Sequence, residues 1–174
     1  MSVKSQTKAE SAHNADQEVF NAAGVLIQFL ASPEDVQDAI CLIRGIMPAT
    51  VVVPLHSHPE PEVIYVLEGS LEVFRAENGG RSGWTTVASG EVATIPGNVQ
   101  HALRNTSSGP VTSVLVTKSG LYNFFRAIAK PFDPNQQPAT PTPEAVQELL
   151  AASAKYGFWM GSPEENAAIG LHIL

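Results

Sequence analysis

The segment that most constrains this chain is residues 56–62, which read HSHPEPE. Side chains of a strand alternate between its two faces, so His56 and His58 point the same way in an extended segment. The Pro-Glu-Pro insert then bends the chain, and Glu62 returns from the strand that follows. His101, further along, offers a fourth ligand. We therefore predict that His56, His58, Glu62 and His101 bind one divalent metal ion inside a small β-barrel.

Imidazole and carboxylate ligands suit several transition metals, so the residues do not choose between Fe, Mn, Ni, Co, Cu and Zn. Three imidazoles and one carboxylate leave one or two coordination positions open, which is typical of catalytic rather than structural sites. The alternative is that no metal is bound: His56 and His58 lie on an exposed strand, and His101 is a core residue whose hydrogen bonds are made within the protein. The chain has five histidines, and three of them stand at these positions, which favours the metal site.

The chain between residues 25 and 117 consists of short apolar or β-branched runs separated by turn residues. The pair Gly69-Ser70 predicts a hairpin between the runs at 62–67 and 71–75, and residues 78–80 (NGG) predict a second turn. Many short strands without helices between them indicate an all-β antiparallel sandwich or barrel. The predicted strands lie at 25–31, 40–46, 50–55, 62–67, 71–75, 84–87, 92–95, 101–105 and 111–117.

The pattern changes after residue 118. Leu121, Phe124, Phe125 and Ile128 form one apolar stripe of a helix. A Pro-rich stretch follows, and Thr142 is then a suitable N-cap for a second helix. We divide the chain into a flexible N-terminal tail (1–20), a β-barrel (21–118) and a helical C-terminal extension packed on the barrel (119–174).

Charge and composition limit the partners. Seventeen acidic against ten basic residues give a net charge of −7, which disfavours nucleic acid and anionic membranes. No apolar run has the length of a membrane span, and the N-terminus lacks the apolar core of a signal peptide, so we expect a cytoplasmic protein. The single cysteine, Cys41, has no partner for an internal disulfide.

Two segments of the chain carry spaced histidine, glycine, acidic, proline and asparagine residues: His56, His58, Glu62 and Gly69 in the first, and Gly90, Pro96, His101 and Asn105 in the second. In this spacing the two segments resemble the paired motifs of the cupin superfamily. Thr50 and Asn98 stand where the motifs have glycine, and asparagine tolerates positive φ better than other non-glycine residues. The resemblance implies a cupin-type antiparallel barrel (double-stranded β-helix or jelly roll) that covers about residues 25–118.

The C-terminal segment contains residues 121–125 (LYNFF), a Pro-rich link and residues 154–157 (AKYG). In these features it resembles the C-terminal extension of small single-domain cupins (monocupins) of the quercetin-dioxygenase-like kind. That resemblance implies a metal-dependent dioxygenase, an oxidoreductase in which Glu62 is both ligand and catalytic base, and a homodimer. Cupins also include metal-dependent lyases, isomerases and decarboxylases that do not use O2, and non-catalytic small-molecule-binding domains. These alternatives stay open, and so does whether the protein is an enzyme.

Alternation along the strands predicts what faces the metal. If Glu62 points inward, Ile64 and Val66 do so as well, and this apolar lining favours a small apolar or aromatic molecule as the partner. The alternative is that such side chains simply fill a narrow barrel. Glu60 has two interpretations: a carboxylate that orients a metal-bound imidazole, or a solvated charge on a turn.

Overall fold

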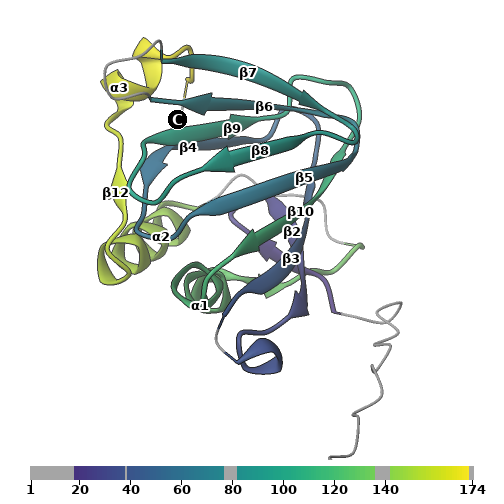
Figure 1. Ribbon diagram of the computed structural model, residues 1–174. Coiled ribbons are helices and arrows are strands. Elements are labelled where there is room, and N and C mark those ends of the chain that lie inside the picture. The colour runs from purple at the N-terminus through teal and green to yellow at the C-terminus, as the bar shows by residue number, and fades with distance from the viewer. Residues whose placement is uncertain (1–17, 38, 77–81, 136–141, 173–174) are drawn as a thin grey trace, which may run out of the picture.

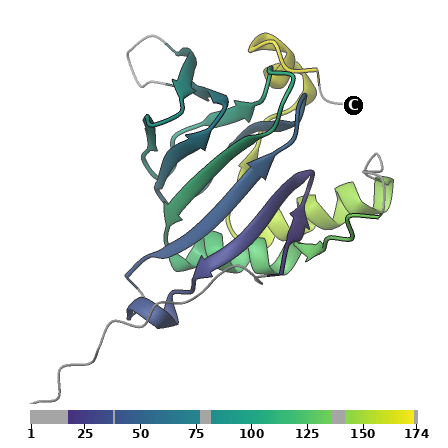
Figure 2. The same ribbon diagram turned by 90° about the vertical axis from the view of Figure 1, so that its right-hand side faces the viewer.

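The computed structural model describes residues 18–37, 39–76, 82–135 and 142–172. Within them, the strands form two antiparallel sheets that pack face to face (Figures 1 and 2). One sheet has the order β11 (Lys130–Pro131), β1 (Phe20–Ala22), β2 (Val25–Ala31), β3 (Cys41–Met47), β10 (Val111–Thr117), β5 (Glu62–Glu68) and β8 (Val92–Ile95). The other has the order β12 (Trp159–Met160), β4 (Val52–Ser57), β9 (His101–Arg104), β6 (Ser70–Arg75) and β7 (Gly83–Ala88).

The predicted all-β class is confirmed, with a jelly-roll arrangement of strands and helices added at the C-terminal end. Alternation explains how the strands build the core. On β5, Ile64 and Val66 are buried while Tyr65 between them is 42% exposed. Leu71 and Val73 on β6 are buried from the opposite sheet and belong to the same apolar cluster. The core therefore lies between the two sheets.

The predicted hairpin between residues 62–67 and 71–75 is wrong. Strand β5 pairs with β10 and β8, and strand β6 pairs with β9 and β7. Gly69 does make a turn, with φ +84°, but this turn carries the chain from one sheet to the other. Turn chemistry reverses the chain without fixing which strands become hydrogen-bonded neighbours. The predicted turn at residues 78–80 lies outside the described residues.

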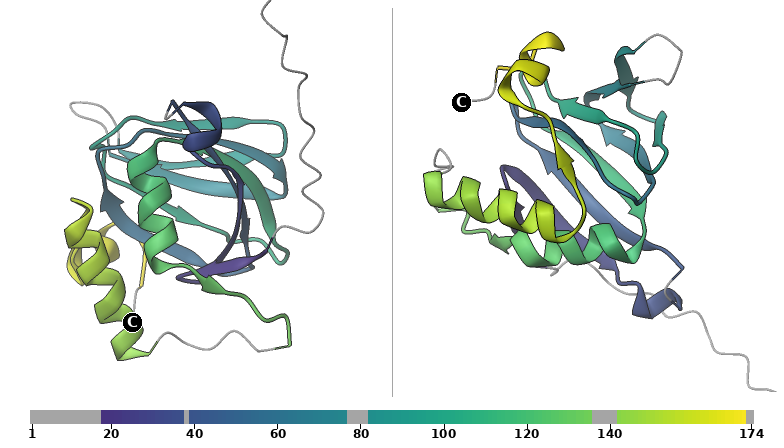
Figure 3. Two further views of the ribbon diagram at one scale, coloured as in Figure 1. Left: turned by 90° about the horizontal axis from the view of Figure 1, so that it is seen from below. Right: turned by 90° about the vertical axis from the view of Figure 1, so that its left-hand side faces the viewer.

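Helices α1 (Ser119–Ile128) and α2 (Pro143–Lys155) contact each other and run along one edge of the sandwich (Figures 1 and 3). The predicted stripe of α1 buries Leu121 and Phe124. The Thr142 hydroxyl accepts a hydrogen bond from the Ala145 N–H and caps α2 as predicted. None of the helices in the described part of the chain has the length and apolar character needed to cross a bilayer.

Two shorter helices complete the described elements: the 3-10 helix η2 (Glu34–Val36) and α3 (Pro163–Ala168). Helix α3 begins with a capping box, in which the Ser162 side chain accepts from the Glu165 N–H and the Glu165 carboxylate accepts from the Ser162 N–H. Most of the predicted N-terminal tail, residues 1–17, lies outside the described residues. The division of the chain into tail, barrel and extension stays a prediction.

Candidate metal centre

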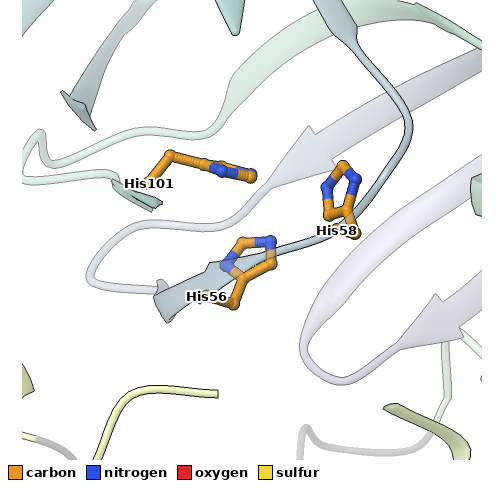
Figure 4. A group of neighbouring side chains, drawn as sticks. All are labelled: His56, His58 and His101. Atoms are coloured by element: carbon orange, nitrogen blue, oxygen red, sulfur yellow. The ribbon is translucent and has the colours of Figure 1, made fainter. Parts of the chain in front are cut away.

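Three histidine side chains, His56, His58 and His101, lie close together (Figure 4). His56 on β4 and His101 on β9 stand opposite each other as paired residues of neighbouring strands. His58 follows β4 by one residue, in the loop that leads to β5. Each contributes a ring nitrogen, and these nitrogens lie within 4.8 Å of one another. All three side chains are buried, so the cluster is shielded from bulk water.

Hydrogen bonds fix which nitrogen two of these rings turn toward the cluster. The Nδ1 of His56 lies 2.7 Å from the Pro54 carbonyl oxygen, and the Nδ1 of His101 lies 2.8 Å from the Val99 carbonyl oxygen. A carbonyl oxygen can only accept, so each Nδ1 carries the hydrogen. The lone pair of Nε2 is then free to bind a metal, as in known histidine–metal sites.

Glu62 reaches the cluster from β5, in the other sheet. Its Oε1 lies 3.2 Å from His58 Nε2, and its Oε2 lies 3.9 Å from His101 Nε2. Both the Glu62 Oε2 and the His101 Nε2 are buried without a hydrogen-bond partner. Buried polar atoms normally have partners, and a divalent cation would satisfy both of these. The donor set therefore fits a transition metal.

Burial sets the charges of these groups. Loss of solvation, followed by the field of His101, lowers the pKa of His56 to about 3. Burial also lowers the pKa of His101. For Glu62, burial alone would raise the pKa, but the contact with His58 and the fields of the three imidazoles together lower it. At neutral pH His56 and His101 are neutral and Glu62 is ionised, the protonation states that metal ligands require.

The structure thus brings the three predicted histidines together and places Glu62 beside two of them. The three-histidine cluster is a candidate metal site, and its ligand types do not determine the metal. The participation of Glu62 and the exact ligand set stay predictions.

The loop that carries His58 and the loop that precedes His101 are in direct contact. The Asn98 N–H donates to the His58 carbonyl oxygen at 2.7 Å, and Asn98 has the positive φ, +63°, that its place in the motif suggested. At Gly97 the approach is so close that a Cβ atom would collide with the Pro59 carbonyl oxygen. The loop that precedes His101 therefore holds the backbone around His58 in place.

Asn105, which matches the second motif, has a structural role just beyond the other end of β9. Its buried side-chain amide donates to the carbonyl oxygens of Met47, Pro48 and Gly109. The backbone carbonyl oxygen of Asn105 accepts a hydrogen bond from the backbone N–H of Thr50, and Thr50 has φ +65°. Thr50 stands where the motif has glycine, and a β-branched residue is strained at positive φ. The hydrogen bonds around Asn105 offset the conformational strain of Thr50.

Sequence reasoning missed one aromatic side chain beside the cluster. The ring centroid of Phe158 lies 4.7 Å from that of His58 and 4.2 Å from that of Phe124 on α1. The next two residues form β12, which pairs with β4 so that Met160 stands opposite His56. No motif marks Phe158, because its position depends on how the C-terminal extension packs.

Asn166 on α3 holds this part of the extension against the barrel. It is fully buried, its side-chain oxygen accepts from the Leu55 N–H at 2.8 Å, and its amide donates to the carbonyl oxygens of Gly161 and Ser162. Gly161 adds a backbone bond to Leu55. The serine and glutamate of the capping box were a usable sequence signal for α3, whereas nothing marked the Asn166 contact.

A cavity of about 160 Å³ lies between the sheets and helices α1 and α2, with His56 and Glu62 in its wall. Its other walls are mostly apolar, including Leu121, Phe124 and Phe158. Among the described residues that line it, none is lysine or arginine. The volume is close to the roughly 150 Å³ of a protein cavity that holds benzene, so one ring-sized apolar molecule fits.

Residues 43–117 match the family model for the cupin domain. No curated protein matches the sequence. Solved structures that resemble this chain share its fold at low sequence identity. The polyketide cyclase RemF from Streptomyces resistomycificus is 22% identical, with a TM-score of 0.54 over 64% of this chain and 80% of that one.

Two further structures are similar. A predicted oxalate decarboxylase from Thermotoga maritima is 19% identical, with a TM-score of 0.54 over 63% of this chain and 98% of that one. The oxalate decarboxylase of Lactobacillus farciminis is 14% identical, with a TM-score of 0.54 over 65% of this chain and only 34% of that one. The domain match and the shared fold support the cupin superfamily.

Proposed function

We propose that this protein is a metal-dependent cupin enzyme, a dioxygenase of the quercetin-dioxygenase-like kind that acts on a small neutral aromatic or enolic compound. The observation that carries the proposal is the position of Glu62. This carboxylate contacts the histidine cluster and also forms part of the wall of an apolar cavity. A substrate oxygen at that wall would meet the metal ligands and a proton acceptor together.

The cavity supports the substrate class. Its apolar lining and lack of basic side chains, among the described residues, disfavour carboxylates and phosphates. Its volume of about 160 Å³ is below the roughly 300–1,000 Å³ of pockets that take drug-sized ligands. We therefore expect a single-ring phenol or enol, or a short diketone, rather than a complete flavonol.

The residues have separate tasks in this mechanism. His56, His58, His101 and Glu62 would hold the ion, which supplies a Lewis acid and, if redox-active, a means of activating O2. Glu62, which forms part of the cavity wall, accepts the proton of the substrate hydroxyl. Phe158 and Phe124 line the cavity and exclude water from the substrate.

The test is oxygen consumption by stripped protein that has been reloaded with each of Fe, Mn, Ni, Co, Cu and Zn. The substrate panel contains single-ring enols and phenols, short diketones and one flavonol. We expect consumption with at least one redox-active metal, entry of 18O into the product, and none with stripped protein. Glu62→Gln should lose the activity, whereas Glu68→Gln, at the exposed far end of β5, should keep it. If no reloaded form consumes oxygen with any compound of the panel, the dioxygenase proposal is refuted.

A second candidate keeps the metal as a Lewis acid without O2, as in a lyase, isomerase or decarboxylase. It is favoured by the fold shared with a polyketide cyclase and with oxalate decarboxylases. Turnover by the zinc form under anaerobic conditions would identify it. A non-catalytic binding protein would instead bind a ring-sized ligand without turnover, and Glu62→Gln would leave that binding largely intact.

The homodimer also stays a proposal. Apolar side chains are exposed next to one another on β5 and β8: Tyr65 is paired with Val92, and Val63 and Leu67 lie on the same face of β5. Sedimentation or light scattering would test it. A Tyr65→Lys variant is expected to shift a dimer toward monomer.

A further inference from the structure

His58 differs from the other two histidines in what faces its Nδ1 atom. His56 and His101 each direct Nδ1 at a backbone carbonyl oxygen two residues earlier. The Nδ1 of His58 instead faces the Glu60 carboxylate, with Oε2 at 3.7 Å, while its Nε2 faces Glu62 at 3.2 Å. His58 therefore lies between two carboxylates, one at each ring nitrogen.

The two facing atoms on the Glu60 side both lack partners. His58 Nδ1 and Glu60 Oε2 are buried, and neither makes a hydrogen bond. The distance of 3.7 Å is a few tenths of an ångström too long for an N–H···O bond. A neutral imidazole carries a single hydrogen. When a metal takes Nε2, that hydrogen is on Nδ1, and Glu60 is the acceptor that faces it.

The surroundings of Glu60 fix its carboxylate. Glu60 stands between Pro59 and Pro61, and the Thr117 hydroxyl donates to the Pro61 carbonyl oxygen at 2.8 Å. Its carboxylate lies directly against Gly120 in the first turn of α1. A Cβ atom at that position would overlap with the Glu60 side chain, Oε1 most closely. The absence of a side chain at residue 120 leaves the space that the carboxylate occupies.

We propose that Glu60 is a positioning residue that accepts the Nδ1 hydrogen of metal-bound His58, and that Gly120 makes room for it. The carboxylate orients the ring and makes Nε2 a stronger donor to the ion. The inference rests on the metal-binding part of the proposed function and needs neither a substrate nor a reaction.

The test measures metal affinity. Stripped wild-type protein, Glu60→Gln and the control Glu68→Gln are titrated with Co²⁺, whose visible spectrum reports ligand geometry, and with Zn²⁺ against a chelator. Glu60→Gln should bind both ions about 10- to 100-fold more weakly, the range typical of lost outer hydrogen-bond partners, and should change the Co²⁺ spectrum. Glu68→Gln should bind as the wild type does. Wild-type affinity and spectrum in Glu60→Gln would overturn the proposal.

Gly120→Ala tests the second part without touching a charge. Alanine is a better helix former than glycine, so a general loss of stability is not expected from the helix itself. The new methyl group should displace the Glu60 carboxylate and weaken metal binding. In the double variant with Glu60→Gln the losses should not add, because both changes remove one interaction. Unchanged affinity in Gly120→Ala, or fully additive losses, would refute the role of Gly120.

Thermal unfolding of the stripped variants checks that each is folded before titration. The two proposals also fail in different ways. If stripped wild-type protein binds neither ion, the metal site itself is refuted. If it binds them and Glu60→Gln binds equally well, only the positioning role fails.

Discussion

The barrel and the C-terminal extension contribute different things to one site. The barrel supplies the four candidate ligands, from β4, the loop after it, β5 and β9. The extension supplies Phe158 beside the imidazoles and much of the apolar cavity wall. The cupin match covers residues 43–117 and ends before the extension begins. The part of the chain that matches the cupin domain therefore carries the candidate metal ligands, while the added part supplies apolar side chains beside them.

The largest expected effect tests the barrel side of this comparison. His101→Ala removes a candidate ligand, so metal affinity should fall by more than the roughly 100-fold upper range for outer partners. Titration of the stripped protein with Zn²⁺ measures it. His172→Ala, which removes an exposed histidine near the C-terminus, is the matched control and should bind as the wild type does. Equal affinity in both variants would contradict the assignment of His101.

The next effect tests how the extension is attached. Asn166→Ala leaves the buried Leu55 N–H without an acceptor, which should lower the free energy of unfolding by about 2 kcal/mol. Urea denaturation measures the loss, and hydrogen exchange should show faster opening of residues 156–171. Asn135→Ala, at an exposed turn, is the control. An unchanged midpoint for Asn166→Ala would mean that the Leu55 contact contributes little.

A pH series tests the barrel side of the comparison, because the buried titrating groups of the candidate site belong to the barrel. The folded-state pKa of His56, about 3, lies below the ordinary 6.5, so the unfolded chain binds more protons between these values. The stability contribution of buried neutral His56 is fully present above pH 6.5 and is lost as pH falls toward 3. The slope approaches about 1.4 kcal/mol per pH unit for this histidine alone.

The lowered pKa of His101 acts in the same direction over this pH range, whereas the lowered pKa of Glu62 removes stability only as pH falls below the ordinary value of 4.5. Urea denaturation of the stripped protein between pH 7.5 and 5 therefore measures the contribution of His56 and His101. His56→Gln should make the dependence shallower, and His172→Gln should not. A slope that His56→Gln leaves unchanged would place the titrating groups elsewhere.

The smallest expected effect concerns Phe158, the aromatic side chain beside the histidine cluster. Phe158→Leu keeps an apolar side chain but loses the ring contacts with His58 and Phe124, which should cost about 1 kcal/mol of stability. Metal affinity should change little, whereas the preference among ring-sized ligands should shift toward bulkier ones. Thermal unfolding and ligand titration check both. A large loss of metal affinity would show that the extension also holds the ligands.

Sequence reasoning succeeded where the determining interactions are local. Alternation along β5 predicted that Ile64 and Val66 are buried, and the propensity of Asn98 for positive φ predicted its turn. The prediction of a hairpin at Gly69 was wrong because the pairing of strands depends on the arrangement of the whole sheet. Phe158 and Asn166 were missed because their contacts with His58 and Leu55 join residues far apart in the chain. No spacing rule encodes such contacts.

The distribution of the candidate ligands has a mechanical consequence. The histidines belong to the five-stranded sheet and its adjoining loop, whereas Glu62 belongs to the seven-stranded sheet. An ion bound by ligands from both sheets would link the two sheets directly. At a free metal concentration 100 times the dissociation constant, such binding adds about 2.7 kcal/mol to the stability of a folded protein. Scarcity of the metal would then shorten the lifetime of the protein against proteolysis.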